Sequence, residues 1–169
     1  MVSNDLNFLE ALVYLSKKDK ILEKVIKEIK PKEPEKREPN FEALVKIISG
    51  QQLSSAAAST IFNRLKEFIG KNKITPQLIN NCKPQQILKC GLSNAKTQYI
   101  LNLSDMFLAE PNILNELKDK ESNEIIEGLQ KFKGIGIWSA SIFALFYLNH
   151  PDVFAWGDIS IKKSIKLLY

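Results

Sequence analysis

Cysteine and histidine are scarce in this chain. Its 169 residues include two cysteines and one histidine. A four-thiolate iron–sulfur cluster or a zinc site of the Cys/His kind needs more ligands than these. The sequence therefore predicts no metal site, and Cys82 and Cys90, in a helical region, are expected to be idle thiols of a reducing compartment.

Long apolar runs are missing as well. No stretch of the sequence approaches the roughly 20 consecutive apolar residues of a membrane-spanning helix. The N-terminus also lacks the apolar run of a signal peptide. We therefore expect no membrane association and an intracellular protein, in the cytoplasm and nucleoid, or in the nucleus if the source is eukaryotic.

Acidic residues are not in excess. The chain has 24 Lys and Arg against 19 Asp and Glu, a formal net charge of +5 and a sequence pI near 9.1. Residues 129–169 hold five lysines and only two aspartates, so the positive charge is concentrated toward the C-terminal end. This surplus fits a polyanionic partner such as nucleic acid, and it also fits simple solubility.

Alternating β-branched runs, which are typical of strands, are absent, and almost every segment has helical periodicity. Phe41, Leu44, Val45 and Ile48 follow the i, i+3, i+4, i+7 spacing of one buried helical face. The sequence predicts an all-α fold. The prolines of residues 31–39 cannot continue a helix, so an extended connector is expected there.

The chain shows no internal repeat or low-complexity tract. We expect a single domain over residues 1–169. If it consists of two helical lobes, the simplest boundaries lie near residues 31–40 and again near residues 120–130.

The most specific local pattern is residues 129–140, which are typical of helix, tight hairpin, helix. Gly134 and Gly136 permit positive φ and leave no side chain over the backbone amides. Amides at the N-terminus of the following helix suit a phosphate group, and Lys131 and Lys133 add charge beside them. An ordinary αα-hairpin whose glycines only make a turn explains the pattern equally well.

A second motif follows the hairpin. Residues 151–158 read Pro-Asp-Val-Phe-Ala-Trp-Gly-Asp and precede a cationic helix. Together the two motifs resemble the helix-hairpin-helix DNA glycosylase superfamily, which is named for a hairpin, a Gly/Pro-rich loop and an aspartate. Phe41 to Ser54, and Gly91 to Ser93 with Lys96, are similar to its alkylation-repair branch, typified by the bacterial 3-methyladenine DNA glycosylase II. The resemblance extends over most of residues 20–166.

The resemblance implies a two-lobed helical fold and a monofunctional DNA glycosylase of base excision repair. Such a protein would bind damaged double-stranded DNA as a monomer, flip out an alkylated purine such as 3-methyladenine, and hydrolyse its N-glycosidic bond without a cofactor. The same fold could act instead on uracil, mismatched or oxidised bases. A non-catalytic DNA-binding module or a helical protein–protein adaptor are the alternatives from other classes.

The resemblance makes Asp158 the catalytic carboxylate. Cleavage of an N-glycosidic bond builds positive charge on the sugar, which a carboxylate stabilises while it orients or deprotonates the attacking water. Asp158 also stands directly before a predicted helix, where aspartate is a good N-cap. The residues alone favour the cap, and the resemblance favours the catalytic role.

The two tryptophans, Trp138 and Trp156, are the expected walls of a pocket for the extruded base. Lyase-type members of the superfamily carry a lysine at the place of Trp138, and an indole cannot form a Schiff base, so simple hydrolysis is expected. Electron-poor alkylated purines stack well on indole. A place in the core is the alternative for Trp138.

Gln51, Gln52 and Leu53 occupy the link where relatives insert a wedge into the gap left by the flipped nucleotide. The bulky apolar wedge of the bacterial type aligns with Gln52, so the choice between Gln52 and Leu53 stays open, and a plain polar loop is the alternative. Lys96 is expected to neutralise a phosphate, and an exposed helix lysine without a specific function is the alternative.

The C-terminal end of the sequence is apolar, with Leu167, Leu168 and Tyr169. Relatives usually continue with helices that close the catalytic lobe. We therefore expect a fold that is short at this end, in a protein that is either longer than this chain or compromised in activity.

Overall fold

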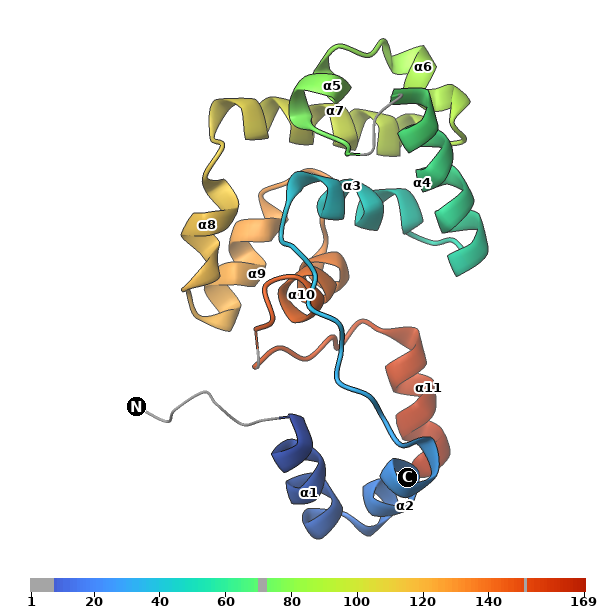
Figure 1. The fold of residues 1–169 in the computed structure, drawn as a ribbon, viewed down its shortest axis with the longest axis vertical. Helices are drawn as coiled ribbons and strands as arrows, with labels where there is room; N and C mark the ends of the chain where they lie inside the picture. The colour runs from blue at the N-terminus through green and yellow to red at the C-terminus, as the bar shows by residue number, and fades with distance from the viewer. Residues whose placement is uncertain (1–7, 70–72, 151) are drawn as a thin grey trace. The chain divides into compact units, whose positions relative to one another are not determined.

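The computed structural model describes residues 8–69, 73–150 and 152–169. Pro151, the first residue of the predicted catalytic loop, lies outside these ranges. All regular secondary structure within them is helical (Figure 1), which confirms the predicted all-α class. The helices are α1 (Phe8–Lys18), α2 (Lys20–Ile29), α3 (Phe41–Gly50), α4 (Ser55–Ile69), α5 (Pro76–Asn80), α6 (Pro84–Lys89), α7 (Asn94–Ala109), α8 (Ile113–Lys118), α9 (Ser122–Gln130), α10 (Ile137–Phe146) and α11 (Ile159–Leu168). None of these helices is long and apolar enough to cross a membrane.

The chain divides into two compact units. One contains α1, α2 and α11, and the other spans Arg37–Gly157. The first boundary falls within residues 31–39, which contain no helix. The second falls between Gly157 and Asp158, so the expected boundary near residues 120–130 was wrong: α9, which spans that region, packs against both α8 and α10 and continues the same unit.

The larger unit is built around α3. Its apolar face, with Phe41, Leu44, Val45 and Ile48, is buried as its periodicity predicts. The side chain of Asn40 caps the helix by accepting a hydrogen bond from the Ala43 amide at 2.9 Å. In Figure 1, α3 lies between α7 and α10, and it packs against both of them and against α4. This core holds the segment after α3 close to the start of α10.

Three aromatic rings extend the core toward the hairpin. The ring of Phe107 on α7 lies 5.3 Å from Phe41 in an edge-on arrangement and 5.8 Å from Phe132. Phe132 and Ile135, on either side of Gly134, are both buried. Because the aromatic and aliphatic side chains next to the turn are packed in the core, the hairpin backbone is held in place.

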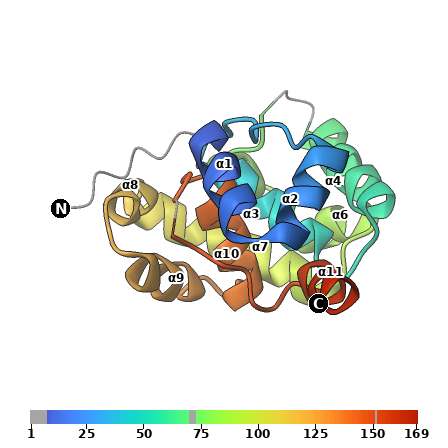
Figure 2. The same ribbon diagram turned by 90° about the horizontal axis from the view of Figure 1, so that it is seen from below.

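The smaller unit has a different character. Its helices α1 and α2 pack against each other (Figure 2), yet no described residue of α1, α2 or α11 is buried. Asp19 caps α2 and also accepts a hydrogen bond from the hydroxyl of Tyr169, at the end of α11. This bond lowers the pKa of the Asp19 carboxyl and raises the pKa of the Tyr169 phenol.

Glu42 provides a test of the packing of the larger unit. Its carboxylate accepts hydrogen bonds from the amide of buried Ile74 at 2.6 Å and from Lys66 at 3.1 Å. Glu42→Ala leaves that buried amide unsatisfied, so we expect the free energy of unfolding to fall by about 1–3 kcal/mol in urea denaturation. The control is Glu67→Ala, which removes an exposed carboxylate of α4. An equal effect of the two substitutions would contradict this role of Glu42.

Candidate functional site

The hairpin between α9 and α10 uses its two glycines differently. Gly134 has φ +89°, the left-handed region that favours glycine, whereas Gly136 has φ −90° and ψ 177°, an extended conformation open to any residue. Positive φ, which the sequence allowed for both, is therefore used at Gly134 and not at Gly136.

Gly134 is also needed for packing. A Cβ atom there would lie 2.3 Å from Cδ2 of Tyr99, so the ring of Tyr99 on α7 occupies the space of the missing side chain. At Gly136 no described atom lies within 4 Å of the corresponding position. Gly136 is the N-cap of α10 and makes no side-chain capping bond, and the positive end of the helix dipole at this terminus favours an anion. Lys131 and Lys133 are exposed on the same hairpin.

A tight turn follows α3. Gln51 has φ −53° and ψ 133°, Gln52 has φ +58°, and the Leu53 amide donates to the Gly50 carbonyl at 3.2 Å. These values are those of a type II turn, with a glutamine at the place that usually takes glycine. Gln52 is exposed and Leu53 is 41% exposed, so both predicted wedge candidates have side chains available to a ligand.

Gln51, the remaining wedge candidate, has its side chain engaged in hydrogen bonds within the protein. Its side-chain amide donates hydrogen bonds to the Gly134 carbonyl at 2.7 Å and to the Ser139 hydroxyl at 3.0 Å. The Gln51 side chain thus joins the turn to the hairpin and to α10. The choice of wedge between Gln52 and Leu53 stays a prediction.

Lys96 has partners that the sequence did not suggest. Its ammonium group donates to the carbonyl oxygens of Ser49 at 2.9 Å and of Gln51 at 2.7 Å. Burial lowers the pKa of the Lys96 ammonium. The structure thus places the Lys96 ammonium at the end of α3, where it supports the turn, and the phosphate contact of Lys96 stays a prediction.

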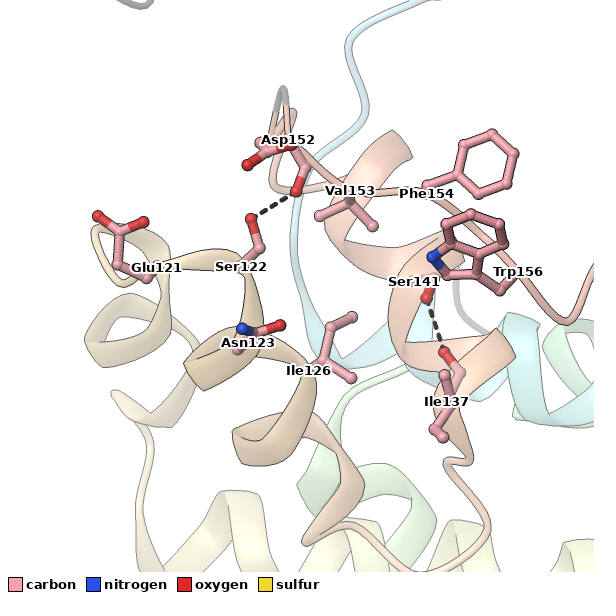
Figure 3. Close-up of a pocket in the computed structure, with 10 residues that line it drawn as sticks. All are labelled: Glu121, Ser122, Asn123, Ile126, Ile137, Ser141, Asp152, Val153, Phe154 and Trp156. Atoms are coloured by element: carbon pink, nitrogen blue, oxygen red, sulfur yellow. Dashed lines mark hydrogen bonds between the residues drawn. The ribbon is translucent and has the colours of Figure 1, made fainter. Parts of the chain in front are cut away.

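A pocket of about 470 Å³ lies beside the loop that follows α10 (Figure 3). Its lining residues come from Glu121 and α9, from α10 and from residues 152–156. The rings of Phe154 and Trp156 meet edge-on with centroids 4.6 Å apart, and Trp156 is 74% exposed. Ser122 donates to the Asp152 carbonyl and so ties the loop to α9. The pocket therefore combines exposed aromatic surface with polar groups.

The two tryptophans differ in their relation to this pocket. Trp156 lines this pocket, whereas Trp138 does not. Trp138 is 38% exposed, so it is not a core residue, and its Cβ lies 3.5 Å from the position of a Cβ at Gly157. Trp138 is therefore beside the loop residue that directly precedes Asp158 in the chain.

Asp158 belongs to the smaller unit, where it is the N-cap of α11. Its Oδ1 accepts hydrogen bonds from the amides of Ser160 at 2.8 Å and Ile161 at 3.1 Å. The predicted cap is confirmed, and these bonds fix the orientation of the carboxylate. A capping role and a catalytic role are compatible, because a carboxylate offers several acceptor positions.

Sequence reasoning missed Tyr99 and Ser139, the partners of Gly134 and Gln51. The residues of the bond from Gln51 to Ser139 are 88 positions apart, and no local pattern marks such a pair. Among the described residues, no cluster of His, Cys, Asp and Glu could hold a metal ion.

Comparisons of the sequence and of the structure with known proteins both point to base excision DNA repair proteins. The model of the HhH-GPD superfamily of base excision DNA repair proteins matches residues 45–169. DNA-3-methyladenine glycosylase 1 of Schizosaccharomyces pombe is 31% identical over 166 residues, which are 95% of this chain and 72% of that protein. A solved structure of an S. pombe 3-methyladenine DNA glycosylase in complex with abasic DNA superposes with a TM-score of 0.84 at 29% identity, over 94% of this chain and 80% of that one.

A further solved structure shares the fold alone. It is an 8-oxoguanine glycosylase/lyase of Clostridium acetobutylicum in complex with double-stranded DNA, which is 22% identical with a TM-score of 0.84 and covers 96% of this chain and 58% of that one. The fold by itself therefore does not distinguish hydrolysis from lyase chemistry.

The two hairpin glycines form a matched pair for a stability test. Gly134→Ala forces a side chain into the left-handed region and against the Tyr99 ring, so we expect a loss of about 2–4 kcal/mol in the free energy of unfolding. Gly136→Ala meets open space and should cost less than about 1 kcal/mol. Thermal or urea unfolding measures both, and equal losses would show that the Tyr99 contact does not constrain the hairpin.

Proposed function

The chain belongs to the HhH-GPD superfamily of base excision DNA repair proteins, and we propose that it is a DNA glycosylase that flips alkylated purines such as 3-methyladenine out of duplex DNA and excises them by hydrolysis. We further propose that it acts as a monomer inside the cell. The observation that carries the proposal is the bond between the turn at residues 50–53 and the hairpin at Gly134. Enzymes that extrude a base combine contacts to the DNA backbone with side chains inserted into the stack, and this bond joins the two segments proposed for these roles.

The hairpin is the proposed phosphate anchor. Gly136 places no side chain at the start of α10, and a Cβ there would meet open space; a helix N-terminus in this position binds a phosphate without reading sequence. Lys131 and Lys133 are exposed nearby and add charge that strengthens the attraction to DNA. This anchor suits a repair enzyme, because a lesion can occur in any sequence.

The turn at residues 50–53 is the proposed source of the wedge. An apolar side chain inserted into the stack fills the gap left by the extruded nucleotide. Leu53 is exposed and apolar, which favours it over Gln52 for this stacking role. Gln52, exposed beside it, can form hydrogen bonds with the partner strand.

The two tryptophans are the proposed walls for the extruded base. Both have exposed surface, and they flank the loop at Gly157, one as its sequence neighbour and the other by packing on it. Indole rings attract electron-poor, cationic alkylated purines more strongly than normal bases. Preference for alkylated purines thus follows from the ring chemistry.

Asp158 is the proposed catalytic carboxylate. The bond between C1′ and the base nitrogen breaks, and the base leaves with the electron pair. The carboxylate stabilises the positive charge that develops on the sugar, and the oxygen of a water molecule bonds to C1′ while Asp158 takes its proton. Since Trp138 has no amine, the chain forms no Schiff base at this position, and the product is an intact strand with an abasic site.

The substitution Asp158→Asn tests this role and spares the helix. Asparagine is as good an N-cap as aspartate, so stability should be retained, whereas single-turnover excision from methylated duplex DNA should fall about 100-fold or more. Asp152→Asn, a carboxylate of the same loop, is the control and should excise normally. Unchanged excision by Asp158→Asn would remove Asp158 from the mechanism. Duplexes with uracil, a mismatch or 8-oxoguanine, assayed alongside, define the substrate range.

The absence of lyase activity is tested on the product strand. We expect the strand to break only after alkali treatment, and borohydride to trap no covalent complex with the wild-type protein, because hydrolysis leaves no imine to reduce. The C. acetobutylicum glycosylase/lyase serves as a positive control for trapping. Strand cleavage without alkali, together with a trapped adduct, would contradict a monofunctional mechanism.

A further inference from the structure

The turn at residues 50–53 adopts a conformation that its own sequence does not favour. Gln52 lies in the left-handed region at φ +58°, which is unfavourable for a residue with a side chain. Backbone strain of this kind persists where the surrounding structure imposes it. Two side chains hold the turn in this conformation, Lys96 of α7 and Gln51 of the turn itself.

Lys96 holds the turn from the side of α7. Its ammonium group bonds to the carbonyls on both sides of Gly50, those of Ser49 and Gln51. These carbonyls lie at the C-terminal end of α3, where the negative end of the helix dipole attracts a cation. Among the described residues, no ion pair includes Lys96. Its half-buried ammonium group donates instead to backbone carbonyls of the turn.

Gln51 holds the turn from the side of the hairpin. An amide group has two hydrogens to donate, and the Gln51 amide has two acceptors, the Gly134 carbonyl at 2.7 Å and the Ser139 hydroxyl at 3.0 Å. Gly134 is in the hairpin and Ser139 is in the first turn of α10. One side chain therefore fixes the turn against both parts of the phosphate anchor.

We propose that Gln51, supported by Lys96, is a positioning residue that locks the turn at residues 50–53 onto the hairpin, so that binding of a DNA phosphate at α10 places the wedge in the base stack. The inference rests on the proposed function, because it explains how this site couples binding of a DNA phosphate to extrusion of the base. Without the lock the phosphate still binds, but the wedge no longer has a fixed position. The free energy of DNA binding then no longer offsets the free energy needed to extrude the base.

The variant Gln51→Met removes both donors and keeps the length of the side chain. We expect its affinity for undamaged duplex to match that of the wild type in fluorescence anisotropy. Its single-turnover excision of a paired lesion should fall about 10- to 100-fold, as expected for two lost hydrogen bonds. The fluorescence increase of a 2-aminopurine placed next to the lesion, which reports unstacking, should be lost in parallel.

A second substrate distinguishes positioning from general damage. A lesion opposite a one-nucleotide gap is already partly unstacked and needs little help to leave the helix. On this substrate the deficit of Gln51→Met should nearly disappear. An equal loss on both substrates, or no loss on either, would overturn the proposal.

Two further variants keep the test decisive. Gln98→Met is the matched control, because Gln98 is exposed on α7 and donates only to Asn102 of the same helix among its described bonds; it should behave as the wild type. Ser139→Ala removes one acceptor of Gln51 and leaves a good helix former, so it should show a smaller loss with the same dependence on substrate, even if Gln51→Met folds poorly.

The 2-aminopurine measurement separates the inference from the proposed function. It needs no bond cleavage, so it compares wild type and Gln51→Met on a mismatched duplex even if the wild type excises no lesion. Absence of excision by the wild type would refute the proposed function alone. An equal fluorescence increase for both proteins would refute the lock alone.

Discussion

Two segments far apart in the chain are joined by one side-chain amide. The hydrogen bond from Gln51 to the Gly134 carbonyl links positions 83 residues apart, and it connects a strained turn to a hairpin whose neighbours Phe132 and Ile135 are packed in the core. The proposed coupling of phosphate binding to base extrusion depends on this link. An anchor can help to open the DNA stack only if the wedge beside it stays in place while the duplex is distorted, since deformation costs energy that contacts must offset.

The hairpin also shows how one motif divides two tasks between two glycines. Gly134 admits the Tyr99 ring, so its missing side chain serves packing. Gly136 meets no described atom, so its missing side chain leaves room for a ligand. The same residue type thus admits a neighbouring ring at one position and leaves open space at the other, and the sequence alone does not distinguish them.

The sequence predicted the features that depend on residues close together in the chain. The buried face of α3 follows from its 3.6-residue periodicity, and the caps at Asn40 and Asp158 follow from side chains that compete for free amides at helix starts. It failed where distant segments meet. The orientation of the Gln51 side chain and the carbonyl partners of Lys96 depend on how α3, α7 and α10 pack, and the boundary at Gly157 depends on the contacts of the whole unit.

The central claim is that this chain releases alkylated purines from duplex DNA without cutting the strand. The direct measurement is chromatography of the bases set free when the wild-type protein is incubated with DNA treated with a methylating agent, with the length of the DNA followed on a denaturing gel. We expect free 3-methyladenine and full-length strands. DNA that is bound but yields no free base would contradict it.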